Sequence, residues 1–483
     1  MIAFLISLAV LIGGYFIYGL IVDRIMGSDS KHPMPAITRR DDIDYRPLPA
    51  WKVFLIQFLN IAGLGPIFGA IMGIMFGPAA FLWISIGTIF GGAVHDFCSG
   101  MISIRSGGGS LPEIVGEQLG RNLRRVMCLF SVLLLILVTA VFVSTPAGLL
   151  SGMTPDYLDR TFWVTVIFAY YLLATLLPID KLIGNLYPIF GFALLFMAAG
   201  LLGVLLTGNV DIPVSFTDGF HSRSATDMPL FPMMFVSIAC GAISGFHATQ
   251  SPMMARCLTN EKLARPIFYG AMVAEGIVAL IWAAAAVTFT GGYEQLAEYM
   301  AVPGHDAGSL VHDVAFGWLG TIGGILAVLG VIAAPITTGD TALRSARLTI
   351  ADFMNINQKG LMRRILVTLP LMGAVIILMM MDFSVLWRYF AWCNQALSVF
   401  TLWAITVYLA RHSKPYVISM LPAMFMTAVC TTYILCAPTP EGFGTDYTTA
   451  AIAGVAAACI PAAIFFSRLS RLPLTLKNTI VND

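Results

Sequence analysis

Apolar residues fill most of the chain in long runs separated by short polar stretches. Thirteen runs approach the length of about 20 residues that a helix needs to cross the hydrocarbon core of a membrane. They lie at about 2–22, 52–76, 79–104, 122–147, 161–178, 184–207, 231–254, 265–290, 317–342, 365–382, 387–410, 415–436 and 447–467. Each is apolar on every face, whereas strands of a membrane barrel alternate polar with apolar positions. The pattern therefore predicts an all-α polytopic membrane protein with about 13 transmembrane helices.

Two runs contain residues that interrupt a helix halfway across the membrane. The second run has NIAGLGP at residues 60–66, where Pro66 lacks an N–H and the glycines tolerate non-helical backbone. The seventh run has CGAISGFHATQSP at residues 240–252. Either segment alone would also fit a simple kink. Unwound backbone cannot face lipid, however, so it must line a cavity or bind something.

The two interrupted runs stand five runs apart, which makes runs 2–6 and 7–11 candidate repeats. Because five is odd, the second repeat would be inverted, and matched interrupted helices then indicate a transporter site. Helix N-termini there suit an anionic substrate, and freed carbonyls suit a cation. We expect an extra helix and loop at 1–51, repeats at 52–207 and 208–410, and two extra helices with a tail at 411–483. The expected substrate contacts are Asn60, Gly63, Gly65, Ser244, Gly245, His247, Thr249 and Gln250.

Few ionisable residues lie inside the runs, and such residues are usually functional. Asp96 and His247 each lie seven to nine residues, or about 10–14 Å, from the same membrane face, so they could share one layer. Such a pair can relay protons or bind a cation, although a structural hydrogen bond is the alternative. Adjacent helical residues point about 100° apart, so His95 and Asp96 would not both face one site. We expect Glu275 to pair with a neighbouring polar group.

Run nine presents oxygens that suit a hard cation such as Na⁺. The Ala334 carbonyl and the hydroxyls of Thr337 and Thr338 share one helix face, and carbonyls near Asn60 and Gly63 could complete a cation site. Ala62 belongs to the same candidate coupling region, together with His95 and Asp96. In the alternative, the threonine hydroxyls only bond back to their own helix. In run eleven, Asn394 and Gln395 are expected to hold helices together.

Composition narrows the class of protein. Of the 483 residues, 58% are apolar and 11% charged, against about 25% charged in soluble proteins. This composition argues against a soluble enzyme, a disordered scaffold and a nucleic-acid binder, and the lipid bilayer is the expected surrounding of the protein. The eight cysteines stand singly, without a zinc or disulfide pattern, and the chain lacks a Walker motif. We expect no cofactor, and no ATP as the energy source.

The distribution of basic residues predicts the orientation. When the connections between runs are numbered alternately, one set holds all of the 27 Lys and Arg residues except Arg160, Arg223 and Arg388. Connections rich in Lys and Arg lie in the cytoplasm. The N-terminus is therefore expected outside and the C-terminus inside. The first run lacks a basic start and a small-residue cleavage site, so we expect a retained helix rather than a signal peptide.

Four segments resemble the carbon starvation protein A (CstA) family. They are GPIFG at 65–69, GAVHDF at 92–97, GAISGFH at 241–247 and RYFAWCNQ at 388–395. The resemblance runs from about residue 45 to residue 410. It implies a secondary transporter of the bacterial inner membrane with a LeuT-like core of five-plus-five inverted repeats. Members of this family are associated with the uptake of peptides or pyruvate.

These observations together predict a symporter that imports a small carboxylate, pyruvate or a short peptide by alternating access. The coupling ion would be Na⁺ or H⁺, and the sequence decides neither between them nor the oligomeric state. A channel-like facilitator is one alternative, but a channel needs a continuous polar lining. A metal-dependent membrane enzyme, with His95 and Asp96 as ligands, is the other.

Overall fold

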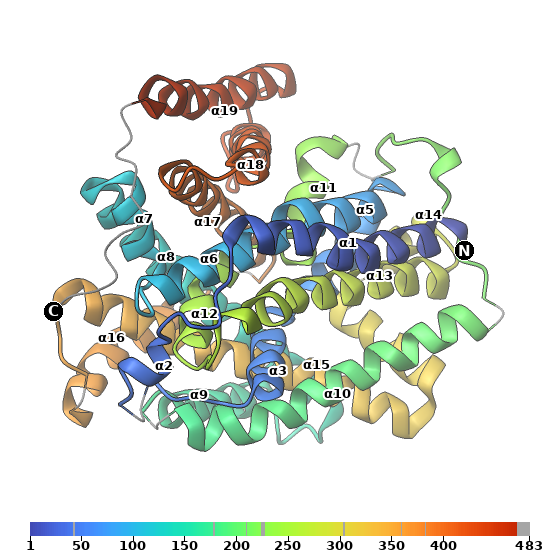
Figure 1. The fold of residues 1–483 in the computed structure, drawn as a ribbon. Helices are drawn as coiled ribbons and strands as arrows, with labels where there is room; N and C mark the ends of the chain where they lie inside the picture. Colours follow the sequence, from blue (N-terminus) through green and yellow to red (C-terminus); the bar gives the residue numbers. More distant parts are fainter. Residues whose placement is uncertain are drawn as a thin grey trace, which may run out of the picture.

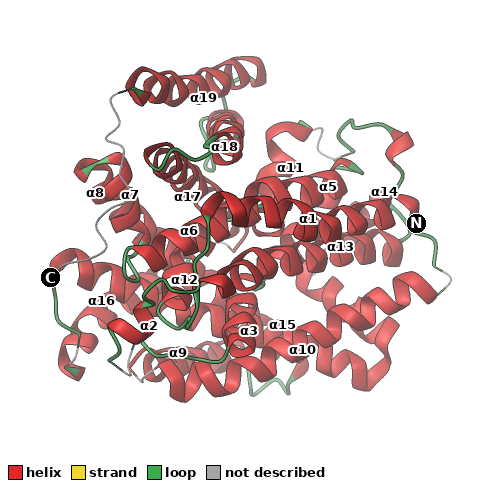
Figure 2. Ribbon diagram, viewed as in Figure 1, coloured by secondary structure: helices red, strands yellow, loops and turns green. Residues whose placement is uncertain are grey.

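The computed structural model describes residues 1–470 except 42–43, 177–178, 209, 224–227, 303–304, 359 and 382. Every regular element within these described residues is a helix (Figures 1 and 2). Among the described residues, eleven helices are long and apolar enough to cross a membrane, or twelve when the bent pair Ala50–Ile61 and Gly65–Ile74 counts as one span. The predicted all-α membrane architecture is thereby confirmed.

The predicted count of 13 spans is not confirmed. The run at 161–178 forms α9 (Arg160–Leu176). This apolar helix has 17 residues and is too short to count among the eleven candidate spans. Residues 177–178 of that run lie outside the described part of the chain. The other twelve runs each contain helix at the expected place.

The first half of the chain holds one broken span and one widened span. Its elements are α1 (Ile2–Met26), α2 (Pro35–Thr38), α3 (Ala50–Ile61), the wide turn η1 (Gly65–Gly69), α4 (Ala70–Ile74), α5 (Ala79–Leu82), the wide helical stretch η2 (Trp83–Gly92), α6 (Ala93–Arg105), α7 (Leu111–Leu119), α8 (Arg121–Met153), α9, α10 (Ile179–Thr207) and η3 (Phe216–Asp218). The span α3–η1–α4 bends by 52° at its break. The span α5–η2–α6 is continuous but widened, which fits its glycine-rich sequence.

The second half begins with the other broken span. Its elements are α11 (Leu230–Ile238), η4 (Ala239–Gly241), α12 (Gly245–Ala255), η5 (Glu261–Leu263), η6 (Arg265–Tyr269), α13 (Gly270–Thr290), α14 (Tyr293–Ala301), α15 (Ala307–Met354), α16 (Leu361–Met379), α17 (Phe383–Arg411), α18 (Val417–Cys436) and α19 (Tyr447–Leu469). Helix α15 is 48 residues long and departs from helical geometry at Gly320, where φ is +66°. The predicted span at 317–342 therefore lies inside a longer, kinked helix.

The broken helices lie in the middle of the bundle. Helix α8 packs along α15, and α12 lies against α6 and α17, while α13 contacts both η1 and η4. Helix α18 packs on α17 and α11, and α19 packs on α18 at the edge of the molecule (Figure 1). The N-terminus lies at the same end of the molecule as α14, and α2 and α7 lie at the opposite end (Figure 1). The centre of the bundle is thus built from the segments in which the sequence predicts a site.

Candidate functional site

The first break follows directly from its sequence. Helix α3 ends at Ile61, and the next residue, Ala62, leaves helical geometry with φ −81° and ψ +45°. Pro66 stands in the first turn of η1, where its missing N–H has no helical partner to lose. Gly63 and Gly65 are fully buried on either side of Leu64. The non-helical backbone therefore lies inside the protein, as the exclusion from lipid requires.

The second break is held by an amide from another helix. Ser244 is extended and precedes α12, and its hydroxyl donates a 2.9 Å hydrogen bond to Oδ1 of Asn394 on α17. The same oxygen accepts the Phe246 N–H at 2.7 Å. Asn394 also donates to the sulfur of Cys240 at 3.1 Å. Asn394 thus holds helices together, as expected, and it does so by satisfying the N-terminus of α12.

The two breaks touch each other. A Cβ atom placed on Gly65 would lie 2.3 Å from the Cβ of Cys240, so only glycine fits at position 65 in this conformation. Thr88 on η2 donates a 3.0 Å hydrogen bond to the Gly241 carbonyl of the second break. Two segments 175 positions apart in the sequence therefore form one buried region.

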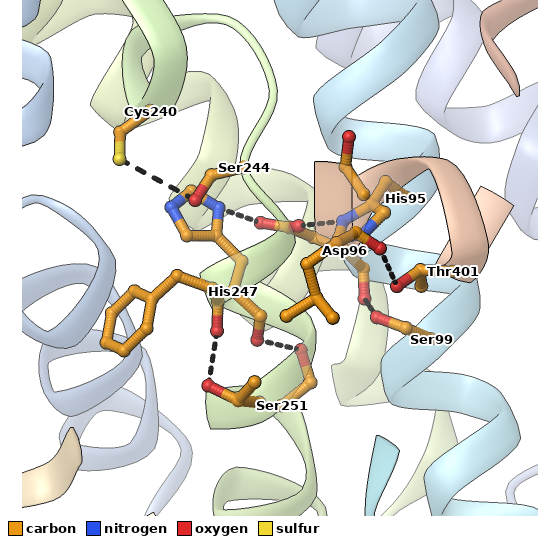
Figure 3. A network of polar contacts seen from close by, with 12 residues as sticks. His95, Asp96, Ser99, Cys240, Ser244, His247, Ser251 and Thr401 are labelled. Atoms are coloured by element: carbon orange, nitrogen blue, oxygen red, sulfur yellow. Dashed lines mark hydrogen bonds and ion pairs between the residues drawn. The ribbon is translucent and has the colours of Figure 1, made fainter. Parts of the chain in front are cut away.

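Beside the breaks lies a chain of four buried titratable side chains. Asp96 on α6 accepts from Nδ1 of His95 through Oδ1 and from Nδ1 of His247 through Oδ2, each at 2.8 Å (Figure 3). Nε2 of His247 lies 3.4 Å from Oε2 of Glu275 on α13. All four residues have zero exposure to solvent. We call these four residues the His–carboxylate chain.

The expectation that His95 and Asp96 do not share a site is wrong. Their Cα–Cβ directions diverge along the helix, but the rotamers of the two side chains turn the imidazole toward the carboxyl group, and their polar atoms meet at 2.8 Å. The expected shared layer of Asp96 and His247 is present as a direct contact. Glu275 does pair with a polar neighbour, and that neighbour is His247.

The oxygens of run nine lie against the first break. Thr338 donates to the Ala334 carbonyl at 2.8 Å and to the Leu59 carbonyl of α3 at 3.1 Å. Thr337 donates to the Ala333 and Ala334 carbonyls of its own helix, as the alternative reading expects. A Cβ on Gly63 would lie 3.4 Å from Oγ1 of Thr338.

Asn60 also reaches this helix. Its Oδ1 accepts from the Thr341 hydroxyl at 3.2 Å. The residues of the predicted cation site are therefore neighbours: Asn60, Gly63, Ala334, Thr337 and Thr338. The Leu59 carbonyl, which the sequence did not single out, lies at the same place and accepts from Thr338. A cation bound there remains a prediction. No cluster of three or more His, Cys, Asp and Glu side chains suited to a metal occurs among the described residues.

Thr249 and Gln250 lie one turn farther along α12 than His247. The Thr249 hydroxyl donates to the Phe246 carbonyl at 2.6 Å, and Gln250 donates to Thr249 at 3.0 Å. Thr249 lines a small hollow with Arg256, toward the end of the helix that lies away from the break. Their predicted contact with the substrate stays a prediction.

A larger cavity, with a volume of about 500 Å³, opens next to the first break. Phe68 of η1 forms part of its wall, and the end of α8 and the starts of α9 and α15 form the rest. Arg160, Asp306 and His312 supply its charged and titratable groups. In the sequence, Arg160 only marks the orientation of the chain, because its place beside Phe68 depends on the three-dimensional fold.

The family comparison covers two thirds of the chain. The family model described as carbon starvation protein CstA matches residues 1–155 and 150–323. An uncharacterised membrane protein of Haemophilus influenzae is 42% identical over 340 residues, which cover 60% of this chain and 91% of that protein.

Two named relatives are more distant. The pyruvate/proton symporter BtsT of Escherichia coli is 28% identical over 340 residues, covering 57% of this chain and 47% of that protein. The peptide transporter CstA of Escherichia coli is 26% identical over 339 residues, covering 57% and 48%. The chain thus aligns with just under half the length of each of these two proteins.

Solved structures show the fold. MhsT in complex with L-phenylalanine matches with a TM-score of 0.55 at 15% identity, over 85% of this chain and 97% of that one. A mutant of the Eremococcus coleocola manganese transporter matches with a TM-score of 0.53 at 12% identity, over 89% and 99%. The expected LeuT-like fold is confirmed.

Proposed function

The chain belongs to the carbon starvation protein CstA family, and from that premise we propose that it is a secondary active transporter of the bacterial inner membrane. Its substrate would be a small carboxylate, either pyruvate or a short peptide, imported with Na⁺ or H⁺ by alternating access. The names of the relatives BtsT and CstA support this substrate class. Residues 52–207 and 208–410 would be the inverted repeats.

The observation that carries the proposal is the contact between two broken helices at the buried centre of the bundle. Helix N-termini carry partial positive charge, so the start of α12 at Ser244 and Gly245 suits a carboxylate. Gly65 and Cys240 are in direct contact in this conformation. Substrate can therefore reach the space between the breaks only when the two segments separate, which is a movement that alternating access provides.

Two separate groups are candidates for binding the coupling ion. The oxygens of Ala334, Thr337 and Thr338, next to Asn60 and Gly63, are the ligand type that Na⁺ prefers. Asp96 and His247 are the type that exchanges protons. Both groups touch a broken helix, so occupancy of either can favour one arrangement of the breaks over another.

The cavity beside Phe68 suits an access route from outside. The distribution of Lys and Arg supports an external N-terminus. The connections that carry Arg160 and Asp306 would then face outward as well. An exposed guanidinium at the mouth of this cavity attracts carboxylates.

Uptake into proteoliposomes tests the proposal. Purified protein is reconstituted, and uptake of labelled pyruvate and of a labelled dipeptide is measured under an imposed sodium gradient, a proton gradient or neither. We expect saturable uptake of one substrate, driven by one gradient, and countertransport when unlabelled substrate is present inside. Liposomes without protein are the control. Flux that does not saturate and shows no countertransport would indicate a channel and overturn the carrier mechanism.

A further inference from the structure

Glu275 is a carboxyl group at the buried end of the His–carboxylate chain. It lies in the apolar helix α13 with zero exposure, and neither of its oxygens accepts a hydrogen bond from the described residues. The titratable groups that face it are His247 on α12, Asp96 on α6 and Cys240 on η4, and none of these is a permanent cation. An ionised carboxylate without a cation or donor is very costly in such surroundings.

The charge of the His–carboxylate chain depends only on how many protons it holds. With both carboxyl groups ionised and both imidazoles neutral, its charge is −2. One added proton on His247 makes that imidazole a bridge between Asp96 and Glu275, with a net charge of −1. A second proton makes the chain neutral. Burial of all four side chains disfavours the two charged arrangements relative to the neutral one.

We propose that Glu275 is the proton acceptor of this transporter and that it exchanges its proton with His247. This inference rests on the proposed transport function and deepens it by naming H⁺ as a coupling ion. In the transfer, the O–H bond at Oε2 of Glu275 breaks and an N–H bond forms at Nε2 of His247, across the 3.4 Å that now separates these atoms. The reverse step reloads Glu275.

The position of His247 links this proton to the moving part. His247 is the third residue of α12, directly after the second break. Its Nδ1 is fixed to Asp96 at 2.8 Å, whereas its Nε2 lies at ion-pair distance from Glu275 but outside hydrogen-bond geometry. A small movement of the start of α12 therefore changes the Glu275 contact most. Proton occupancy and the arrangement of the break are thus coupled in both directions.

The test compares Glu275→Gln with the wild type and with Glu294→Gln, which alters an exposed carboxylate on α14. In proteoliposomes, substrate uptake driven by a pH gradient is measured together with proton influx reported by an enclosed pH-sensitive dye. We expect Glu275→Gln to lose both, and to keep the exchange of internal for external substrate, which needs no net proton release. Glu294→Gln should behave as the wild type does. Gradient-driven uptake with proton influx in Glu275→Gln would overturn the inference.

An infrared measurement makes the inference independent of the substrate. Difference spectra between low and high pH contain C=O bands from all the carboxyl groups that titrate, and the component of protonated Glu275 should be present in the wild type and missing in Glu275→Gln. An unchanged band would overturn the assignment. If Glu275→Gln does not survive purification, Glu275→Asp replaces it. That variant should retain coupling and shift the band, and a band identical with the wild type would refute the proposal.

The outcomes separate this inference from the transport function. If the wild type transports neither substrate, the proposed function fails, and the infrared band still decides whether Glu275 binds a proton. If the wild type transports substrate with sodium and moves no proton, the function stands and the inference is overturned.

Discussion

A methyl group at position 65 would collide with the second broken helix. The Cβ atom of Gly65→Ala would lie 2.3 Å from the Cβ and 2.5 Å from the sulfur of Cys240, whereas ordinary contact begins at 3.4 Å. One segment must therefore move by about 1 Å, in a region where both residues are buried and rotamer changes cannot displace a Cβ. The variant thus tests whether the arrangement of the two broken helices depends on the contact between Gly65 and Cys240.

The expected cost follows from overpacking. Extra methyl groups in a close-packed interior cost about 1–3 kcal/mol. Because 1.4 kcal/mol corresponds to a factor of ten, the conformation with touching breaks should lose about 5- to 150-fold in population relative to one in which they are apart. The free energy of unfolding should fall by the same amount if no conformation relieves the collision.

Thermal unfolding in detergent and substrate exchange in proteoliposomes together provide the assay. Gly373→Ala on α16 is the matched control, because a Cβ there meets no atom within 4 Å. Combining Gly65→Ala with Cys240→Gly should restore stability and exchange, whereas Cys240→Ala keeps the colliding Cβ and should not. If Gly65→Ala matches Gly373→Ala in both assays, the two breaks do not touch and the reasoning fails.

Three further substitutions probe the remaining contacts. Asp96→Asn removes the anionic acceptor of two imidazoles, and each hydrogen bond to a charged group is worth about 1.5–3 kcal/mol. We expect uptake by this variant to lose its pH dependence, and a normal pH profile would contradict the coupling role of Asp96. Thr338→Ala removes an oxygen of the candidate cation site, and the sodium concentration for half-maximal uptake should rise; an unchanged sodium response would exclude that site. Asn394→Ala leaves the Ser244 hydroxyl and the Phe246 N–H without their acceptor, at about 1–3 kcal/mol for each buried group, and an unfolding midpoint equal to that of the wild type would refute its capping role.

The spans and their two interruptions could be predicted because they depend on local properties of the chain. An apolar run of sufficient length has to be a membrane helix, and Pro66 with its flanking glycines disrupts helical hydrogen bonding wherever the run lies. The same reasoning placed Asn394 between helices, since an amide at membrane depth needs a partner. The predicted number of membrane spans is not confirmed because α9 is shorter than the spans that the other apolar runs form.

The chain of side chains around Asp96 could be predicted only in part. Equal depth placed Asp96 and His247 in one layer, but nothing in the sequence specifies that α13 brings Glu275 to the other side of the same imidazole. His95 and Asp96 were expected to face different sites because their Cα–Cβ directions diverge, but side-chain rotamers bring their polar atoms together. The hydrogen bond from Thr338 to the Leu59 carbonyl could not be predicted either, because it depends on how α15 crosses α3.

The hydrogen bonds at the two breaks indicate how the breaks can separate. The first break is tied to α15, through Thr338 and Leu59, whereas the second is tied to α17, through Asn394. Each segment can therefore keep its own partner while the packing contact between Gly65 and Cys240 opens. Among the described contacts, Asp96 and Glu275 reach the second segment through His247, so a change of protonation acts directly on α12. Proton binding would accordingly move the second break first, and the first break would respond through the contact at Gly65.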